Sequence, residues 1–254
     1  MSREWVDVRV EGAIAEVVLR RPPHNVLNRA MIAELREAVS EAVSRKETRV
    51  LFLRGEGKSF CAGVNIGDHM PGKFEQAIPE FDALAREIAD AEVPSVAFLH
   101  GNVLGGGLEL GIATDLAYAA AGAKLGQPEI KLAVFPPFAA ALAPSILGAR
   151  RAAELVLTGK TYTAAEARDL GLVNAVFADE EAEAKTREVV RGIASLSRPA
   201  LVLAKKALRC TDRERRDRLA EAERIYVSEL MKHSDPVEGL TSFLEKRPPT
   251  WRDS

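Results

Sequence analysis

The pattern of hydrophobic and polar positions near the N-terminus changes from the alternation typical of a strand to the spacing typical of a helix. They alternate over residues 6–10, and a second β-rich run covers 14–19, so the pattern predicts two strands joined by a turn. Apolar residues then recur at helical spacing through 28–43, directly behind Asn28, whose side chain is a good helix cap. A further strand is expected over 49–53. The chain therefore begins with a hairpin and then a helix leading into a third strand.

The middle of the chain continues this alternation. Residues 55–73 are polar and contain glycine, which predicts a long loop, and the following helix is expected over 75–91. Strands are expected over 93–99 and 115–119, with a glycine-rich helix start at 105–107 between them. Strands that alternate with helices favour an α/β architecture.

Helix signals dominate from residue 138 onward. Thr163 and Glu166 have the spacing of a capping box. Further helices are expected over 180–196, 199–210, 212–232 and 236–247. We assign residues 1–195 to an α/β core and residues 196–254 to a C-terminal helical region of the same domain.

Composition excludes several classes of protein. The chain has 254 residues, of which 47% are hydrophobic, and its 35 basic and 37 acidic residues give a net charge of −2. This balance gives no general attraction to nucleic acid or to an anionic membrane, so we expect neither as a partner. Two cysteines, Cys61 and Cys210, are too few for a disulfide framework. No signal peptide or membrane-spanning stretch is visible, and we expect a cytoplasmic protein.

Two glutamates twenty positions apart are the strongest candidates for catalysis. Glu109 follows three glycines in the first turn of an expected helix, where the helix dipole favours an ionised carboxylate. Glu129 follows a Gly-Gln-Pro turn in an apolar neighbourhood, where loss of water raises the pKa of a carboxyl group. Carboxyls in opposed environments suit a general base and a general acid.

Two segments rich in small residues have backbone amides that can face a ligand. Residues 59–66 follow a strand, and residues 105–107 open a helix. Together they can donate two N–H groups to one developing oxyanion. Glycines in such places serve packing equally often. The segments lack the pattern of a phosphate loop or of a dinucleotide fingerprint, so nucleotide binding there is not expected.

Three motifs in this order and spacing resemble the enoyl-CoA hydratase/isomerase (crotonase) family. They cover residues 60–66, 101–110 and 126–130, and the segments from 157 to 174 are also similar to later motifs of that family. The resemblance implies a crotonase-like α/β fold of repeated ββα units with a C-terminal helical oligomerisation region. It also implies an acyl-CoA substrate and a homotrimer or dimer of trimers. No cofactor is expected beyond the coenzyme A of the substrate.

The resemblance assigns roles to four residues. The amides of Val64 and Gly106 would form the oxyanion hole for the thioester carbonyl. Glu109 would orient and deprotonate a water molecule, and Glu129 would donate a proton to the enolate. Family isomerases typically keep only the second glutamate, so the presence of both favours a hydratase over an enoyl-CoA isomerase.

The sequence also departs from the family pattern. Asn65 replaces the usual aspartate, and a Phe-Pro-Pro-Phe run replaces a glycine-rich segment after the second glutamate. The members of this run, expected to wall the substrate pocket, are Phe135, Pro136, Pro137 and Phe138. Residues 130–137 resemble the subgroup that hydrates cyclohexa-1,5-diene-1-carbonyl-CoA in aromatic compound degradation. Ordinary drift in a hydratase of linear, short-chain enoyl-CoA, as in fatty acid metabolism, is the alternative.

The resemblance places coenzyme A contacts at Ala62, Phe243 and Lys246. No metal site is expected, because His69 and His100 have no partner at ligand spacing. A protein that binds acyl-CoA, RNA or a partner on a crotonase fold without catalysis is the remaining alternative. The two glutamates and both oxyanion segments argue against it.

Overall fold

The computed structural model describes residues 3–209 and 212–252. The predicted hairpin is confirmed: β1 (Val6–Glu11) pairs antiparallel with β2 (Ile14–Leu19). Asn28 caps α1 (Arg29–Ser44) by accepting the Met31 N–H at 2.9 Å. The predicted strand follows as β3 (Val50–Gly55), parallel to β2.

The main sheet has six strands in the order β1-β2-β3-β4-β6-β9. Its other members are β4 (Ser95–Leu99), β6 (Leu116–Ala120) and β9 (Ala175–Phe177). Every neighbouring pair except β1 and β2 is parallel. Helices therefore connect the parallel strands, as the alternating pattern predicts.

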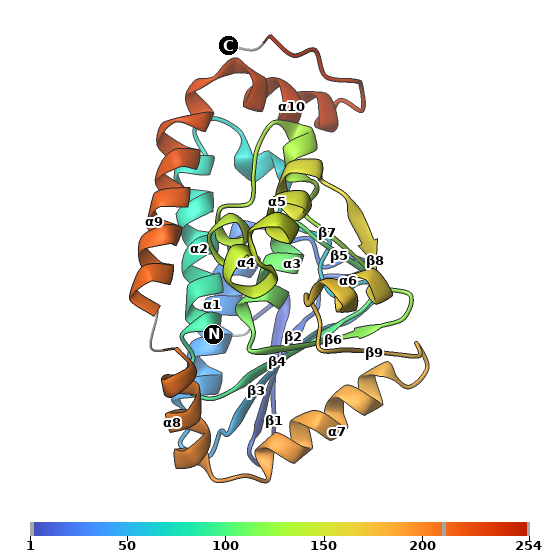
Figure 1. Cartoon of the computed structure of the whole chain (residues 1–254), viewed down its shortest axis with the longest axis vertical. Coiled ribbons are helices and arrows are strands. Elements are labelled where there is room, and N and C mark those ends of the chain that lie inside the picture. The colour runs from blue at the N-terminus through green and yellow to red at the C-terminus, as the bar shows by residue number, and fades with distance from the viewer. Residues whose placement is uncertain (1–2, 210–211, 253–254) are drawn as a thin grey trace.

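Helices cover both faces of this sheet (Figure 1). The helices α1 and α2 (Phe74–Ala89) pack on one face over the larger apolar core. On the other face, α7 (Ala182–Ala194) buries Ala182 and Val190 against sheet residues that include Phe52 and Phe98. A largely parallel sheet is stable in water only when both of its faces are covered in this way.

A second, three-stranded sheet was not predicted from the sequence. It consists of β5 (Asn102–Leu104), β7 (Lys124–Gly126) and β8 (Thr161–Thr163), in that order. Strands of three residues are too short to display a clear alternation. This sheet matters for the site because β5 leads directly into α3 (Gly106–Ala113), the glycine-rich helix.

The remaining helices are η1 (Ile66–His69), η2 (Pro128–Leu132), α4 (Pro137–Leu147), α5 (Ala149–Thr158), α6 (Ala164–Leu170), α8 (Arg198–Leu208), α9 (Asp212–Ser228), η3 (Leu230–Lys232) and α10 (Ser234–Leu244). The predicted capping box is confirmed: Thr163 and Glu166 bond reciprocally at the start of α6. Cys210, at the end of one expected helix, lies outside the described residues. Within the described ranges, no helix is both long enough and apolar enough to cross a bilayer.

Figure 1 shows where the C-terminal helices lie. The helix α9 runs alongside α2, and α10 closes the end of the molecule near α5. Contacts join α9 to both α2 and α4, and join α10 to η1 and η2. The C-terminal helices therefore pack against the segments that carry the candidate site residues.

Candidate active site

A cavity of about 610 Å³ lies where α2, α3, η1, η2 and α10 meet. Its wall is mainly apolar, as is usual for a small-molecule site. It brings together the predicted residues Val64, Gly106, Glu109 and Glu129. Further lining residues are Val26, Ala62, Gly63, Asn65, Ile66, His69, Ala77, Ile78, Phe81, Asp82, Leu104, Gly105, Pro128, Lys131, Leu132, Phe135, Pro136, Pro137, Phe243 and Leu244.

Two backbone N–H groups at the cavity wall are not used in the hydrogen bonds of a helix or a strand pair. Val64 forms an isolated parallel bridge with Leu27, in which Leu27 donates to the Gly63 carbonyl and Asn65 donates to Leu27. This pairing does not use the Val64 N–H. Gly106 is the first residue of α3, where an N–H has no acceptor within the helix. Both groups are therefore available as donors at the same wall.

Close packing explains the glycines at the start of α3. A Cβ on Gly106 would lie 2.7 Å from Cγ2 of Val64 and 3.1 Å from the Phe81 ring. A Cβ on Gly107 would lie 2.0 Å from the carbonyl oxygen of Cys61. Glycine is needed here so that the segment containing Cys61 and Val64 can approach the helix start.

Glu109 lies on α3 and is only 4% exposed. Its Oε1 accepts the Ala139 N–H at 2.8 Å, in the first turn of α4. Burial nevertheless raises the pKa of Glu109 to about 7, although the N–H groups of Ala139 and Phe138 lower it. The prediction that a helix start keeps the Glu109 pKa low was therefore wrong, because desolvation outweighs the amides.

Glu129 lies on η2 and borders the cavity close to Gly105. A Cβ on Gly105 would lie 2.6 Å from the Glu129 Oε1. Burial, and then the nearby charge of Glu109, raises the pKa of Glu129 well above its ordinary value. With its amide nitrogen facing the carboxyl group, Gln127 donates to the two oxygens at 3.0 and 3.1 Å. The predicted rise of the Glu129 pKa is borne out.

The expected pocket wall is only partly at the cavity. Phe135, Pro136 and Pro137 line it, and the Phe135 ring meets Tyr226 edge-on with centroids 5.4 Å apart. Phe138 is not among the lining residues. It lies on the first turn of α4, where its side chain is 1% exposed and belongs to the main core.

Only two of the three predicted coenzyme A contacts lie at the cavity. Ala62 and Phe243 line the cavity, together with Leu244 from the same end of α10. Lys246 is exposed and is not part of the lining. Asn65, the departure from the family pattern, accepts the Gly67 N–H at 2.8 Å and so caps η1.

Two cavity-lining groups were not identified as site residues in the sequence analysis. Asp82 on α2 lines the cavity and is 0% exposed. His69, set aside on the sequence, also lines it and bonds through Nδ1 to the Tyr226 hydroxyl at 3.0 Å. Burial lowers the pKa of His69 to about 4, so this ring is neutral at ordinary pH. The one signal in the sequence that could have identified Asp82 is a carboxyl group at an apolar position of the expected helix.

Other reactive side chains do not form a second centre. Cys61 is buried, and burial raises the pKa of its thiol to about 12, which fits a packing role. Across residues 3–209 and 212–252, no group of three or more His, Cys, Asp or Glu side chains is arranged to hold a metal ion.

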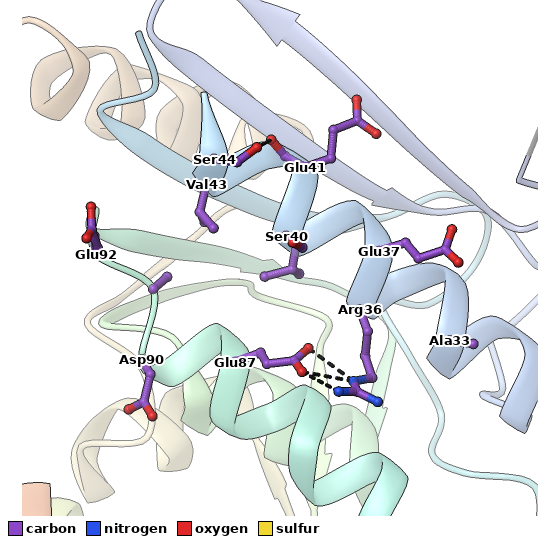
Figure 2. Close-up of a pocket in the computed structure, with 12 residues that line it drawn as sticks. Ala33, Arg36, Glu37, Ser40, Glu41, Val43, Ser44, Glu87, Asp90 and Glu92 are labelled. Atoms are coloured by element: carbon purple, nitrogen blue, oxygen red, sulfur yellow. Dashed lines mark hydrogen bonds and ion pairs between the residues drawn. The ribbon is translucent and has the colours of Figure 1, made fainter. Parts of the chain in front are cut away.

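A larger hollow of about 930 Å³ lies between α1 and α2, away from the glutamates (Figure 2). Arg36 and Glu87 pair across it with an N–O distance of 2.5 Å. The other carboxylates, including Glu37 and Glu41, point in different directions in Figure 2. Solvated charges without a shared focus do not indicate a catalytic site.

Comparison with known proteins identifies the family. The family model described as enoyl-CoA hydratase/isomerase matches residues 9–254. The chain belongs to the enoyl-CoA hydratase/isomerase family, whose enzymes include hydro-lyases. The match covers both oxyanion segments and both glutamates.

Individual relatives agree with this assignment. A cyclohexa-1,5-dienecarbonyl-CoA hydratase of Thauera aromatica is 38% identical over 244 residues, covering 96% of this chain and 94% of the relative. A probable enoyl-CoA hydratase of Rhizobium meliloti is 33% identical and covers 97% of each chain. The crystal structure of an enoyl-CoA hydratase from Mycobacterium avium subsp. paratuberculosis matches with a TM-score of 0.89 at 29% identity, over 99% of this chain and 100% of that one. The crotonase-like fold expected from the motifs is thus confirmed.

Proposed function

We propose that this protein adds water to a conjugated acyl-CoA thioester, with cyclohexa-1,5-diene-1-carbonyl-CoA as its substrate. The observation that carries the proposal is that Glu109 and Glu129 border the same apolar cavity as the Val64 and Gly106 amides. An enolate requires an oxyanion hole, and hydration requires a base and an acid. The cavity offers groups suited to each of these tasks.

The thioester carbonyl would accept hydrogen bonds from the N–H groups of Val64 and Gly106. Its oxygen gains negative charge when a nucleophile adds to the β-carbon. In a cavity with few waters, each such donor contributes roughly 3 kcal/mol to stabilisation of the transition state. The close approach of Val64 to Gly106 supports this role.

The two glutamates would divide the proton transfers. With a pKa of about 7, Glu109 is substantially ionised near neutral pH and can take a proton from the attacking water. Glu129, whose pKa is raised well above the ordinary value, retains its proton and can deliver it to the enolate. The Gln127 amide would hold the Glu129 carboxyl in place.

The choice of a cyclic diene rests on sequence similarity and on the pocket wall. The Thauera aromatica relative named for this substrate is 38% identical over nearly the whole length. Phe135, Pro136 and Pro137 give this side of the cavity flat and rigid surfaces, which suit a planar ring. Relatives named probable enoyl-CoA hydratase are 30–33% identical, so linear substrates belong in the test.

The coenzyme A portion would lie near Ala62 and Phe243, at the cavity wall. Lys246, which is exposed on the same C-terminal segment, would reach a phosphate of the nucleotide. We further propose a homotrimer or dimer of trimers in the cytoplasm that needs no cofactor. Sizing by light scattering tests the assembly.

Mass spectrometry in oxygen-18 water and, separately, in deuterium oxide tests the function. The purified protein would be incubated with crotonyl-CoA, a cyclohex-1-ene thioester and the cyclohexa-1,5-diene thioester. We expect uptake of labelled oxygen mainly by the diene. Preference for crotonyl-CoA would assign a linear enoyl-CoA hydratase, and deuterium exchange without oxygen uptake would assign an isomerase. Absence of any acyl-CoA binding would point to a different role for the fold.

A further inference from the structure

Asp82 occupies a position at which the helix pattern calls for an apolar residue. On α2, Ala77, Ile78 and Phe81 line the cavity at helical spacing, and Asp82 continues the same stripe. Its exposed fraction is 0%. A carboxyl group in such a stripe costs stability unless it has a partner, so its presence there calls for a functional explanation.

The protein supplies Asp82 with no donor. Neither Oδ1 nor Oδ2 has a hydrogen-bond partner in the described part of the chain. Burial first, and then the like charges of Glu109 and Glu223, raise the pKa of Asp82 well above its ordinary value, while Arg86 lowers it. Asp82 is therefore a buried carboxyl group that borders the cavity and whose protonated form is favoured by its surroundings.

Asp82 and Glu129 line the same cavity as Glu109 but belong to different elements. The charge of Glu109 raises the pKa of each. Glu129 belongs to η2 beside Gly105, whereas Asp82 belongs to α2, which packs against α9. The cavity thus holds one base and two acids on separate walls.

Hydration of a cyclic diene offers a second carbon at which an acid can deliver a proton. When water adds to C2 of the ring, whose C1 carries the thioester, the negative charge spreads over the carbonyl oxygen, C1 and C5. A proton at C1 gives simple addition, and a proton at C5 gives addition across the conjugated system. C1 carries the thioester, whereas C5 lies across the ring from C2, so a donor on another wall of the cavity is well placed to reach it.

Resting on the function proposed above, we propose that Asp82 is a third catalytic carboxyl group, which protonates the far end of the dienolate at C5. Glu109 removes a proton from water as the oxygen bonds to C2. The electrons of the C1–C2 double bond enter the dienolate, and those of the C5–C6 double bond form the new bond from C5 to the Asp82 proton. A double bond between C1 and C6 remains, and the product equals substrate plus water.

Exchange with solvent completes the step. Asp82 regains a proton, and Glu109 loses the proton that it took from water, so both carboxyl groups return to their starting states. Glu223 on α9 is half-buried and is a like charge that raises the Asp82 pKa.

Kinetics of Asp82→Asn test this role, because asparagine keeps the size and polarity of the side chain but cannot transfer a proton. We expect the ratio of diene hydration to crotonyl-CoA hydration to fall about 100-fold, the usual effect of losing a general acid. Glu87→Gln is the matched control on the same helix, since Glu87 faces Arg36 in the separate hollow of Figure 2. An equal loss on both substrates, or no loss, would overturn the proposal.

The wild-type enzyme provides a second test that does not depend on how the variant folds. In deuterium oxide, NMR of the product should place deuterium at C5, the methylene next to the vinylic carbon. Deuterium at C1 or C3, the two carbons bonded to the hydroxyl-bearing C2, would rule out a far-end donor. If the wild type does not hydrate the diene at all, the proposed function itself fails, and the role of Asp82 fails with it.

Discussion

Oε1 of Glu109 accepts the Ala139 N–H at 2.8 Å, and this bond joins the candidate base on α3 to the first turn of α4. The carboxyl group faces the N-terminus of α4, so the dipole of that helix, rather than only that of α3, favours its ionised form. The segment that precedes α4 carries Phe135 and Pro136. The proposed specificity wall and the proposed base are thus fixed to one another.

The buried charge of Glu109 should reduce stability at alkaline pH. Its folded pKa of about 7 lies above the ordinary value of 4.5, so ionisation costs folding free energy as pH rises between these values. We expect Glu109→Gln to be more stable than wild type by roughly 2–4 kcal/mol at about pH 8 and nearly equal to it at about pH 4. Thermal unfolding at the two pH values measures this. A stability difference that does not change with pH would contradict it.

The same group should control the acid side of the activity profile. Glu109 must be ionised to accept a proton, so kcat/KM should fall roughly tenfold per pH unit below about pH 7. Initial rates across a series of buffers measure this limb. A profile that stays flat from about pH 5 to about pH 7 would show that Glu109 is not the base.

Gly105 should be required for the position of Glu129. In Gly105→Ala, the added Cβ would lie 2.6 Å from the Glu129 Oε1, at a residue whose φ is 52°. Displacement of the acid should reduce kcat by roughly 100-fold in a folded protein. Gly192→Ala is the control, because nothing lies within 4 Å of its added Cβ, and it should keep wild-type activity. Equal activity of the two variants would show that the position of Glu129 does not matter for catalysis.

Phe135 should select the acyl group, whereas Phe138 should not. Phe135→Leu removes a ring that lines the cavity and contacts Tyr226, so we expect the preference for the diene over crotonyl-CoA to fall roughly tenfold. Phe138→Leu changes a core residue of the same type and should lower the melting temperature while preserving the ratio. If both variants shift the ratio alike, Phe135 acts only through packing.

Local signals in the sequence predicted much of the fold. The hairpin, the Asn28 cap and the Thr163 capping box each depend on residues close together in the chain. The three strands of the small sheet are too short for a periodic signal, so they were missed. The two glutamates were found because each stands beside a distinctive turn.

The missed parts of the site depend on contacts between distant segments. His69 bonds to Tyr226, which is 157 positions away, and neither has a motif around it. The pKa of Glu109 follows from burial that α4 helps to create, so the position of Glu109 on α3 gave the wrong direction. Asp82 became visible as a cavity group only when the stripe of α2 was placed against α3 and α9.

Oxygen-18 uptake by wild type and by Glu109→Gln, measured side by side on the cyclic diene thioester, tests the central proposal most directly. We expect the wild-type product to gain one labelled oxygen, and the variant to do so at least about 100-fold more slowly, since its amide cannot accept a proton from water. Thermal unfolding of the variant provides the check that it is folded. Equal rates of oxygen uptake, or a wild-type product without labelled oxygen, would contradict a hydratase that uses Glu109 as its base.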